Sequence, residues 1–328
     1  MKVIVPLAGK GTRLLPLTKR VPKPLVKVAG RPVMDYVMDT IWGFAIEELI
    51  VITGHLKEQV EQYIATHYPI PARFVEQKTL DGTAGAINLA RPYVDGPVLI
   101  VFVDTLFDAD LSVIQTLDAD GIIWAKEVED YRRFGVIVTD EAGYMTRIVE
   151  KPDAPLSRLA NIGLYYIRDW KTLFDGIAHV LRQPLNKGEF YLTDAFQYMI
   201  DRGRRIITAR VHGWYDCGKV ETLLETNHHL LEQGRTRRPS GPLARVTIRE
   251  PVYIEDGVTI HDATVGPNVS IETGCFITES RVENSILGKN VRVVCGTVRD
   301  SLIGDGEEIV STTIERSVLD RGELASAR

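Results

Sequence analysis

Cysteine, histidine and long apolar runs are all scarce in this 328-residue chain, and each scarcity excludes a class of protein. The three cysteines, Cys217, Cys275 and Cys295, are too few and too widely spaced for a disulfide framework or a thiolate metal cluster. The seven histidines show no ligand spacing. The longest purely apolar run, Val98 to Val103, is far shorter than a membrane span. The first residues enter a strand pattern directly, so we predict no secretion signal and expect a reducing, cytoplasmic compartment.

Negative charge dominates overall, but one segment has none. The formal net charge is -5, which argues against a nucleic-acid partner. Between residues 10 and 31 there is no acidic residue, and the cations there are Lys10, Arg13, Lys19, Arg20, Lys23, Lys27 and Arg31. A short cationic segment without aromatic residues predicts a compact anionic ligand such as a phosphate. A solvated basic face is the alternative interpretation.

Strand and helix patterns alternate through the first two thirds of the chain. Strands are predicted at 3–7, 49–53, 72–76, 98–103 and 164–167, a hairpin at 135–149, and helices at 32–44, 56–67, 83–90, 191–202 and 220–232. This alternation predicts an α/β, Rossmann-like domain over residues 1–235 with a mixed, mainly parallel sheet. Ligands of such sheets bind beyond the carboxyl ends of the strands, so the loops after Leu7, Glu76 and Val103 are the expected site.

A different pattern follows a linker predicted at residues 233–242. Aliphatic residues recur every six or seven positions and glycines punctuate the turns; the aliphatic positions are Val252, Val258, Val265, Ile271 and Ile277. The repeat predicts a short left-handed parallel β-helix over residues 243–322, with imperfect periodicity from Arg281 onward. We expect a structural role for it in oligomer formation or domain packing. Acyl transfer would need a histidine base, and His261 is the only histidine in this region.

A glycine loop follows the first predicted strand directly, with the sequence Leu7-Ala8-Gly9-Lys10-Gly11-Thr12-Arg13-Leu14-Leu15-Pro16. Glycines in this position let backbone N–H groups approach phosphate oxygens. Leu14 replaces the third glycine of a dinucleotide fingerprint, and Gly11 stands where a P-loop has Ser or Thr. Taken alone, such a loop is more often an ordinary turn.

The continuation of this loop resembles the signature of the nucleoside-diphosphate-sugar pyrophosphorylases. The added residues are Thr18, Lys23-Pro24-Leu25 and Gly30-Arg31-Pro32. This family includes glucose-1-phosphate thymidylyltransferases and UTP–glucose-1-phosphate uridylyltransferases. Further segments resemble the family in order: Glu76-Gln77, Asp81 to Ala86, Asp104, Phe134 to Val136, Glu150-Lys151-Pro152, Ala160 to Gly163, Gly188 to Asp194 and Trp214 to Gly218. The resemblance spans about residues 2–232.

The resemblance implies a nucleotidyltransferase that joins UTP or dTTP to a sugar 1-phosphate, with glucose 1-phosphate expected, and releases pyrophosphate. It implies that Arg13 and Lys23 are catalytic and that Asp104 and Asp216 hold Mg²⁺. The nucleotide-binding residues it implies are Leu7, Ala8, Gly9, Gly11, Thr12, Arg13, Gln77, Gly82 and Thr83. Those for the sugar phosphate are Gly135, Glu150, Lys151 and Asn161. We expect no nucleic-acid or membrane partner, and a homo-oligomer.

Three alternatives stay open. The wording from Gly82 to Ala86 also occurs in GTP enzymes that make GDP-mannose. A non-catalytic regulatory homologue would bind nucleotide sugar without turnover, although such subunits usually lose the charged residues present here. A β-helix scaffold with a relic α/β domain would bind no triphosphate. One departure stands out: Val103 occupies the usual glycine position before Asp104, where a β-branched side chain could crowd the nucleotide.

Overall fold

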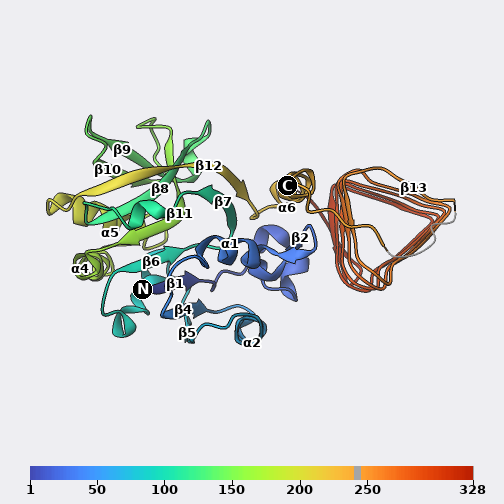
Figure 1. Cartoon of the computed structure of the whole chain (residues 1–328), viewed down its shortest axis with the longest axis horizontal. Coiled ribbons are helices and arrows are strands. Elements are labelled where there is room, and N and C mark those ends of the chain that lie inside the picture. Colours follow the sequence, from blue (N-terminus) through green and yellow to red (C-terminus); the bar gives the residue numbers. More distant parts are fainter. Residues whose placement is uncertain (240–244, 328) are drawn as a thin grey trace. The chain divides into compact units, whose positions relative to one another are not determined.

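The computed structural model describes residues 1–239 and 245–327 and divides into two compact units (Figure 1). The first contains Met1–Gly9 and Val37–Trp214, and the second contains Lys10–Tyr36 and Tyr215–Arg328. The cationic segment therefore groups with the C-terminal repeat. The predicted domains, 1–235 and 243–322, remain a prediction, and residues 240–244 between them lie outside the described residues.

A ten-stranded mixed sheet forms the first unit. Its strands are β1 (Lys2–Pro6), β4 (Glu48–Thr53), β5 (Ala72–Glu76), β6 (Val98–Val101), β7 (Thr105–Ala109), β8 (Gly121–Glu127), β9 (Gly135–Thr139), β10 (Met145–Glu150), β11 (Leu159–Ile167) and β12 (Ile206–Asp216). The order is β5-β4-β1-β6-β11-β8-β12-β7, and β9 pairs with β10 and β11. Strands β5, β4, β1 and β6 run parallel, whereas β11 runs antiparallel to β6, β8 and β9. The predicted mixed, mainly parallel sheet and its inserted hairpin are confirmed.

Both faces of the parallel strands β1, β4 and β6 are buried. The helices of this unit are α2 (Lys57–His67), α3 (Thr83–Asn88), α4 (Trp170–Val180) and α5 (Leu192–Asp201), together with the C-terminal part of α1 (Val33–Ile41). Ile4, Ile50 and Ile100 share one core cluster with residues of α3, α4 and α5. Their neighbours Val3 and Leu49, which point to the opposite face, are equally buried. Double burial is why these strands appear in the sequence as unbroken apolar runs.

The second unit opens with the cationic segment. This segment forms three short 3₁₀ turns, η1 (Thr12–Leu14), η2 (Leu17–Lys19) and η3 (Lys23–Leu25), and a small antiparallel hairpin of β2 (Lys27–Val28) and β3 (Arg31–Pro32). The chain re-enters the unit at Tyr215 and forms α6 (Val220–Glu232). Among residues 1–239 and 245–327, no helix combines the length and apolar character that crossing a bilayer requires.

The C-terminal repeat is a three-sided parallel β-helix, whose sides are visible in Figure 1. One side contains β13 (Thr247–Ile248), β16 (Thr264–Val265), β19 (Arg281–Glu283), β22 (Thr297–Arg299) and β25 (Thr313–Glu315). The second contains β14 (Val252–Ile254), β17 (Val269–Ile271), β20 (Ile286–Leu287), β23 (Leu302–Ile303), β26 (Ser317–Asp320) and β27 (Glu323–Ser326), and the third β15 (Thr259–His261), β18 (Phe276–Thr278), β21 (Arg292–Val294) and β24 (Glu308–Val310). Apart from the antiparallel end pair β26–β27, the pairing is parallel and is consistent with the left-handed form.

The length of a coil changes along the β-helix. Val252 pairs with Val269, 17 positions later, whereas Ile286 pairs with Leu302, 16 positions later. Each coil still directs aliphatic side chains into one core. The shortened coil explains why the repeat becomes imperfect after Arg281, although the helix itself continues to Asp320.

Buried serines tie successive coils together at one corner. Ser285 Oγ accepts a hydrogen bond from the Ser301 backbone N–H at 3.1 Å, and Ser301 Oγ accepts one from the Ser317 N–H at 3.2 Å. Ser285 and Ser301 are both fully buried. Each hydroxyl therefore satisfies a backbone donor that water does not reach.

We expect Ser301→Ala to lower the free energy of unfolding by about 1–3 kcal/mol, because it leaves the buried Ser317 N–H without its acceptor. Urea unfolding followed by circular dichroism measures the change. Ser311 is an exposed serine of the β-helix, so Ser311→Ala is the matched control and should unfold like the wild type. Equal loss in both variants would contradict the role given to Ser301.

Candidate functional site

The carboxyl ends of β1, β5 and β6 lie at one edge of the sheet, where the expected loops begin. Leu7 and Ala8 are buried there, and the Leu7 N–H donates to Ile52 O at 2.7 Å. Gly54 approaches Ala8 so closely that a Cβ on it would lie 2.8 Å from Ala8 O. Gly9, in contrast, is exposed, and a Cβ there would meet nothing within 4 Å. The loop therefore begins anchored and becomes open at Gly9.

Gln77 is a buried amide whose orientation is set by two acceptors. Its Nε2 donates to Asp81 Oδ1 at 3.0 Å and to Gly82 O at 3.2 Å. Only the NH₂ end of an amide can face two acceptors, so Oε1 is the group left to address a ligand. The Thr83 hydroxyl, which was predicted to contact the nucleotide, has a structural partner: it accepts a hydrogen bond from the Leu192 N–H at 2.9 Å.

Three of the four residues predicted for the sugar phosphate meet in one partly buried cluster. Asn161 Nδ2 donates to Gly135 O at 2.9 Å, and Thr193 Oγ1 donates to Glu150 Oε2 at 3.2 Å. A Cβ on Gly135 would lie 2.8 Å from Glu150 Oε2 and would clash with the Asn161 amide. Gly135 is therefore needed to let the carboxylate and the amide approach each other. Burial raises the pKa of Glu150, and the charge of Lys151 only partly opposes this.

Lys151, the fourth predicted residue, is held beside this cluster. Its Nζ donates to Tyr191 Oη at 3.1 Å and lies 4.8 Å from the Tyr191 ring centroid. Its backbone adopts a left-handed conformation with φ 44°, and Lys187 Nζ donates to Lys151 O at 2.6 Å. Burial lowers the pKa of Lys151, but the Tyr191 hydrogen bond and nearby Glu150 outweigh it, so the net pKa is raised. The ammonium remains charged, as an anion-binding group requires.

Tyr165 is a further member of the same cluster. Its hydroxyl donates to Asn161 Oδ1, and burial, with additional contributions from the Glu150 and Asp104 carboxylates, raises its pKa. Asp104 lies between β6 and β7, three residues after β6 ends at Val101. The side chain of Val103 is only 4% exposed and packs within the protein. Its effect on a bound nucleotide remains a prediction.

Within the second unit, the glycine loop is closed by contacts of its own. Gly11 adopts the left-handed conformation with φ 62°, and Thr18 Oγ1 donates to Gly11 O at 2.8 Å. A Cβ on Gly11 would lie 3.2 Å from Lys23 Cβ. The turn η1, which carries Thr12 and Arg13, and the turn η3, which begins at Lys23, are therefore brought together around Gly11.

Arg13 and Asp216 meet at Gly218, also within the second unit. A Cβ on Gly218 would lie 2.7 Å from both Arg13 Nη2 and Asp216 Oδ1. The Gly218 N–H donates to Asp216 Oδ1 at 2.7 Å and orients that carboxylate. The structure thus brings together a predicted catalytic cation and a predicted metal ligand that are about 200 residues apart in the sequence.

The predicted metal ligands supply hard oxygen donors. Across residues 1–239 and 245–327, no group of three or more His, Cys, Asp or Glu residues could enclose an ion. Mg²⁺ does not need such a cage, because it keeps several waters and is often bound by one or two carboxylates together with substrate phosphates. Asp104 in the first unit and Asp216 in the second each offer a carboxylate of the kind that such binding uses, and their joint role as metal ligands remains a prediction.

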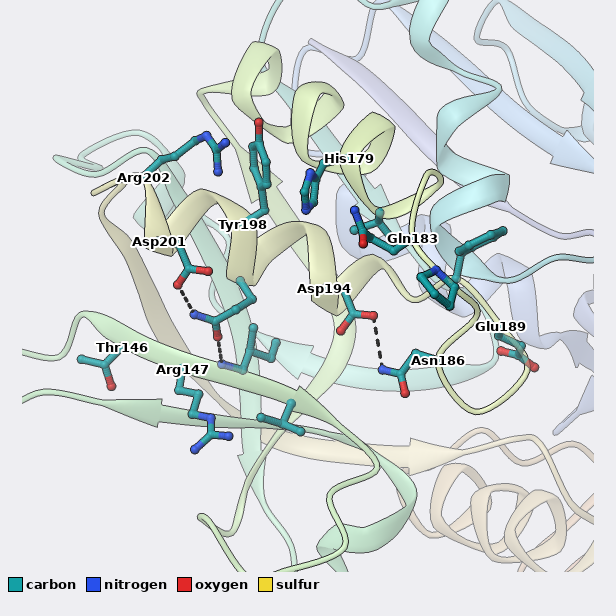
Figure 2. A pocket seen from close by; sticks show the side chains of 16 residues that line it. Thr146, Arg147, His179, Gln183, Asn186, Glu189, Asp194, Tyr198, Asp201 and Arg202 are labelled. Carbon is teal, nitrogen blue, oxygen red and sulfur yellow. Dashed lines mark hydrogen bonds between the residues drawn. The ribbon is translucent and has the colours of Figure 1, made fainter.

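The first unit also contains a cavity of about 620 Å³ (Figure 2). It is lined by α4, α5, β10 and the loop between the helices, with Tyr198 flanked by His179 and Arg202. Asp194 in its wall accepts from Asn186 Nδ2 at 3.3 Å. The residues that line this cavity include none of the predicted site residues, although Val149 directly precedes Glu150 in the chain.

Residues without an individual role in the sequence analysis complete these clusters. Tyr191 and Thr193 lie in a segment whose resemblance was noted as a whole, and Gly218 follows Asp216 by two positions. Among the described residues the indole N–H of Trp214 is buried without a hydrogen-bond partner, and its ring packs 4.9 Å from that of Phe134, next to Gly135. Each of these residues lies inside a segment that resembles the family, which is the only sign of it in the sequence. The contacts that it makes depend on the fold.

Known proteins resemble this chain along most of its length. The profile of the nucleotidyl transferase family matches residues 2–233. The bifunctional protein GlmU of Methanococcus aeolicus is 32% identical over 89% of this chain and 74% of its own length. The UTP–glucose-1-phosphate uridylyltransferase AglF of Haloferax volcanii is 33% identical over 71% of this chain and 98% of its own.

Two further similarities extend this comparison. A glucose-1-phosphate thymidylyltransferase of Streptomyces antibioticus is 28% identical over 89% of this chain and 93% of its own length. A solved structure of UDP-glucose pyrophosphorylase complexed with UDP-glucose superposes with a TM-score of 0.63 and 27% identity, covering 71% of this chain and 98% of that one.

We expect Glu150→Gln to raise the free energy of unfolding at pH 8. Because burial raises the pKa of Glu150 in the folded state, ionising it there costs free energy, and glutamine of the same shape avoids that cost. The gain should shrink as the pH falls toward about 4, where an ordinary carboxyl group is protonated in the unfolded chain too.

Urea unfolding at several pH values measures this dependence. Glu141→Gln, at an exposed acid in the turn between β9 and β10, is the matched control and should show no gain. A gain that did not depend on pH, or a loss at pH 8, would contradict the burial argument.

Proposed function

Because this chain belongs to the nucleotidyl transferase family, we propose that it transfers the nucleotidyl group of UTP or dTTP to a sugar 1-phosphate, with glucose 1-phosphate the expected acceptor. Pyrophosphate is the second product. The observation that carries the proposal is the partly buried cluster in which Gly135, Glu150 and Asn161 meet beside the charged Lys151. Carboxylate and amide groups suit sugar hydroxyls, and an ammonium suits the sugar's phosphate.

The reaction brings two anions together, so neutralising and positioning charge is the main requirement. The sugar phosphate oxygen attacks the α-phosphorus, and the bond to pyrophosphate breaks. Arg13, whose planar guanidinium forms paired hydrogen bonds, is assigned to the triphosphate and the leaving pyrophosphate. Lys23 acts as a point charge at the α-phosphate. Lys151 holds the phosphate of the sugar, while Glu150 and Asn161 bind its hydroxyls.

The orientation of Gln77 supports a choice of base. Since its Nε2 is occupied by Asp81 and Gly82, its Oε1 accepts from the base. Uracil, thymine and guanine present a ring N–H donor at this edge, whereas the matching ring nitrogens of cytosine and adenine are acceptors. UTP and dTTP are preferred over GTP because the uridylyltransferase and thymidylyltransferase relatives named above use those bases.

Members of this family generally use a divalent metal, and we propose Mg²⁺ held by Asp104 and Asp216. When bound, the ion would neutralise charge on the triphosphate and polarise its α-phosphate. The Gly218 N–H contact fixes the Asp216 carboxylate for that role. We further expect the enzyme to act in the cytoplasm, where its free cysteines stay reduced, and to form a homo-oligomer through the β-helix.

Asp104→Asn should lower kcat by at least about 100-fold in a pyrophosphate-release assay with Mg²⁺, UTP or dTTP and glucose 1-phosphate, because it removes charge from the metal-binding carboxylate. Asp108→Asn, at an exposed position four residues later, should keep wild-type turnover. Normal turnover in Asp104→Asn would refute the metal assignment. Absence of pyrophosphate release by the wild type with every triphosphate and sugar phosphate would favour a regulatory homologue.

Gln77→Ala should weaken base selection more than it slows the reaction, since the phosphate contacts remain in place. We expect the preference for UTP or dTTP over CTP and ATP, measured as kcat/KM ratios, to fall by about tenfold or more. Gln62→Ala, a substitution of the same type on α2, serves as the control. Wild-type kcat/KM highest with GTP would replace the pyrimidine assignment by the guanylyltransferase alternative.

A further inference from the structure

The cationic segment is fastened to the β-helix on both sides of Lys23. Upstream, Arg20 Nη1 lies 3.2 Å from Asp320 Oδ1, and the Asp320 side chain is only 4% exposed. Downstream, Lys27 Nζ lies 2.5 Å from Glu272 Oε2 and 3.8 Å from Glu255 Oε1. The three side chains of the downstream pairs, Lys27, Glu255 and Glu272, are each at most 26% exposed.

A buried amide adds a third fastening. Asn227 on α6 is fully buried, and its Oδ1 accepts from the Ala29 N–H at 2.9 Å and from Ser270 Oγ at 2.6 Å. Its Nδ2 donates to Asn268 O at 3.3 Å. One side chain thus joins the segment, α6 and a β-helix coil. Gly30, the next residue of the segment, packs against the Tyr253 ring so closely that a Cβ there would overlap it.

Several cations of the segment pair with carboxylates of the protein itself, so the segment is more than a binding site for an anionic ligand. Lys19, Arg20 and Lys27 pair with β-helix carboxylates, Lys19 with the exposed Glu323, and Arg31 lies 3.9 Å from Asp35. Protein carboxylates therefore pair with Lys19, Arg20, Lys27 and Arg31. The exposed Lys19 pair contributes little, whereas the partly buried pairs restrict the chain between residues 20 and 27.

We propose that Glu272, Asp320 and Asn227 are positioning residues, through which the β-helix holds Lys23 in the geometry that the triphosphate requires. This inference rests on the proposed function, which gives Lys23 its role at the α-phosphate. Displacing a phosphate-binding cation by about 1 Å can cost up to about 100-fold in rate, so a fastening remote from the chemistry can control it. The β-helix is then part of the catalytic apparatus as well as a packing domain.

Glu272→Gln separates positioning from stability. Burial raises the pKa of Glu272 despite the opposing charge of Lys27, so the neutral amide should not unfold the protein. We expect KM for the triphosphate to rise about tenfold, with backbone hydrogen exchange accelerated across residues 10–36 and unchanged across residues 37–214. Asp320→Asn should act in the same direction. Lys27→Met should match Glu272→Gln, while Lys27→Arg should restore a KM near that of the wild type.

Two reference variants make the outcomes distinguishable. Glu308→Gln, whose carboxylate pairs with Arg292 on another side of the β-helix, should change neither KM nor exchange. Lys23→Ala tests the proposed function itself. Faster exchange with a raised KM in Glu272→Gln supports the inference, and unchanged exchange overturns it. Faster exchange with a normal KM, while Lys23→Ala binds triphosphate poorly, also overturns it. Normal triphosphate binding by Lys23→Ala overturns the proposed role of Lys23, and the inference with it.

Discussion

A parallel strand that is covered on both faces can offer polar groups to a ligand only where the strand ends. This constraint determines where the first unit can bind a ligand. Val3, Ile4 and Val5 in β1 are completely buried, so the chain becomes available only beyond Leu7 and Ala8. The loops after β5 and β6 emerge at the same edge because those strands run in the same direction. The antiparallel strands β9, β10 and β11 then add Gly135, Glu150 and Asn161 as a second wall.

The charged residues of the cationic segment have two roles, one structural and one chemical. The cationic segment could not dock on a protein without carboxylates to receive it, and the β-helix supplies Glu255, Glu272 and Asp320. Arg13 instead lies against Gly218, next to Asp216. The segment thereby serves two purposes: some of its cations hold it in place, and Arg13 and Lys23 are assigned to phosphate. Burial raises the pKa of both Glu272 and Asp320, which means that it disfavours their ionised forms. The nearby cations Lys27 and Arg20 oppose this effect and stabilise the charged carboxylates.

Elements with one strong local pattern were predictable, and those that depend on distant partners were not. The strand at 72–76 and the helix at 220–232 coincide with β5 and α6. The apolar run from Val98 to Val103, however, leaves strand geometry after Val101, since Phe102 and Val103 belong to the turn before Asp104. Strands β7, β8 and β12 were not predicted individually, because their neighbours in the sheet are far away in sequence. The β-helix period was recognised, but its change from 17 to 16 residues was not.

The sequence by itself determined the family-like order of motifs, the α/β and β-helix classes, and the residue types available for phosphate, sugar and metal. These follow from local spacing, which a linear pattern records. Only the tertiary structure decided that Gln77 offers its carbonyl oxygen, that Glu150 meets Asn161 across Gly135, and that the cationic segment is held by the β-helix. Such facts depend on which distant side chains share a buried volume, and neither burial nor a hydrogen-bond partner more than 200 residues away is written in the spacing of a chain.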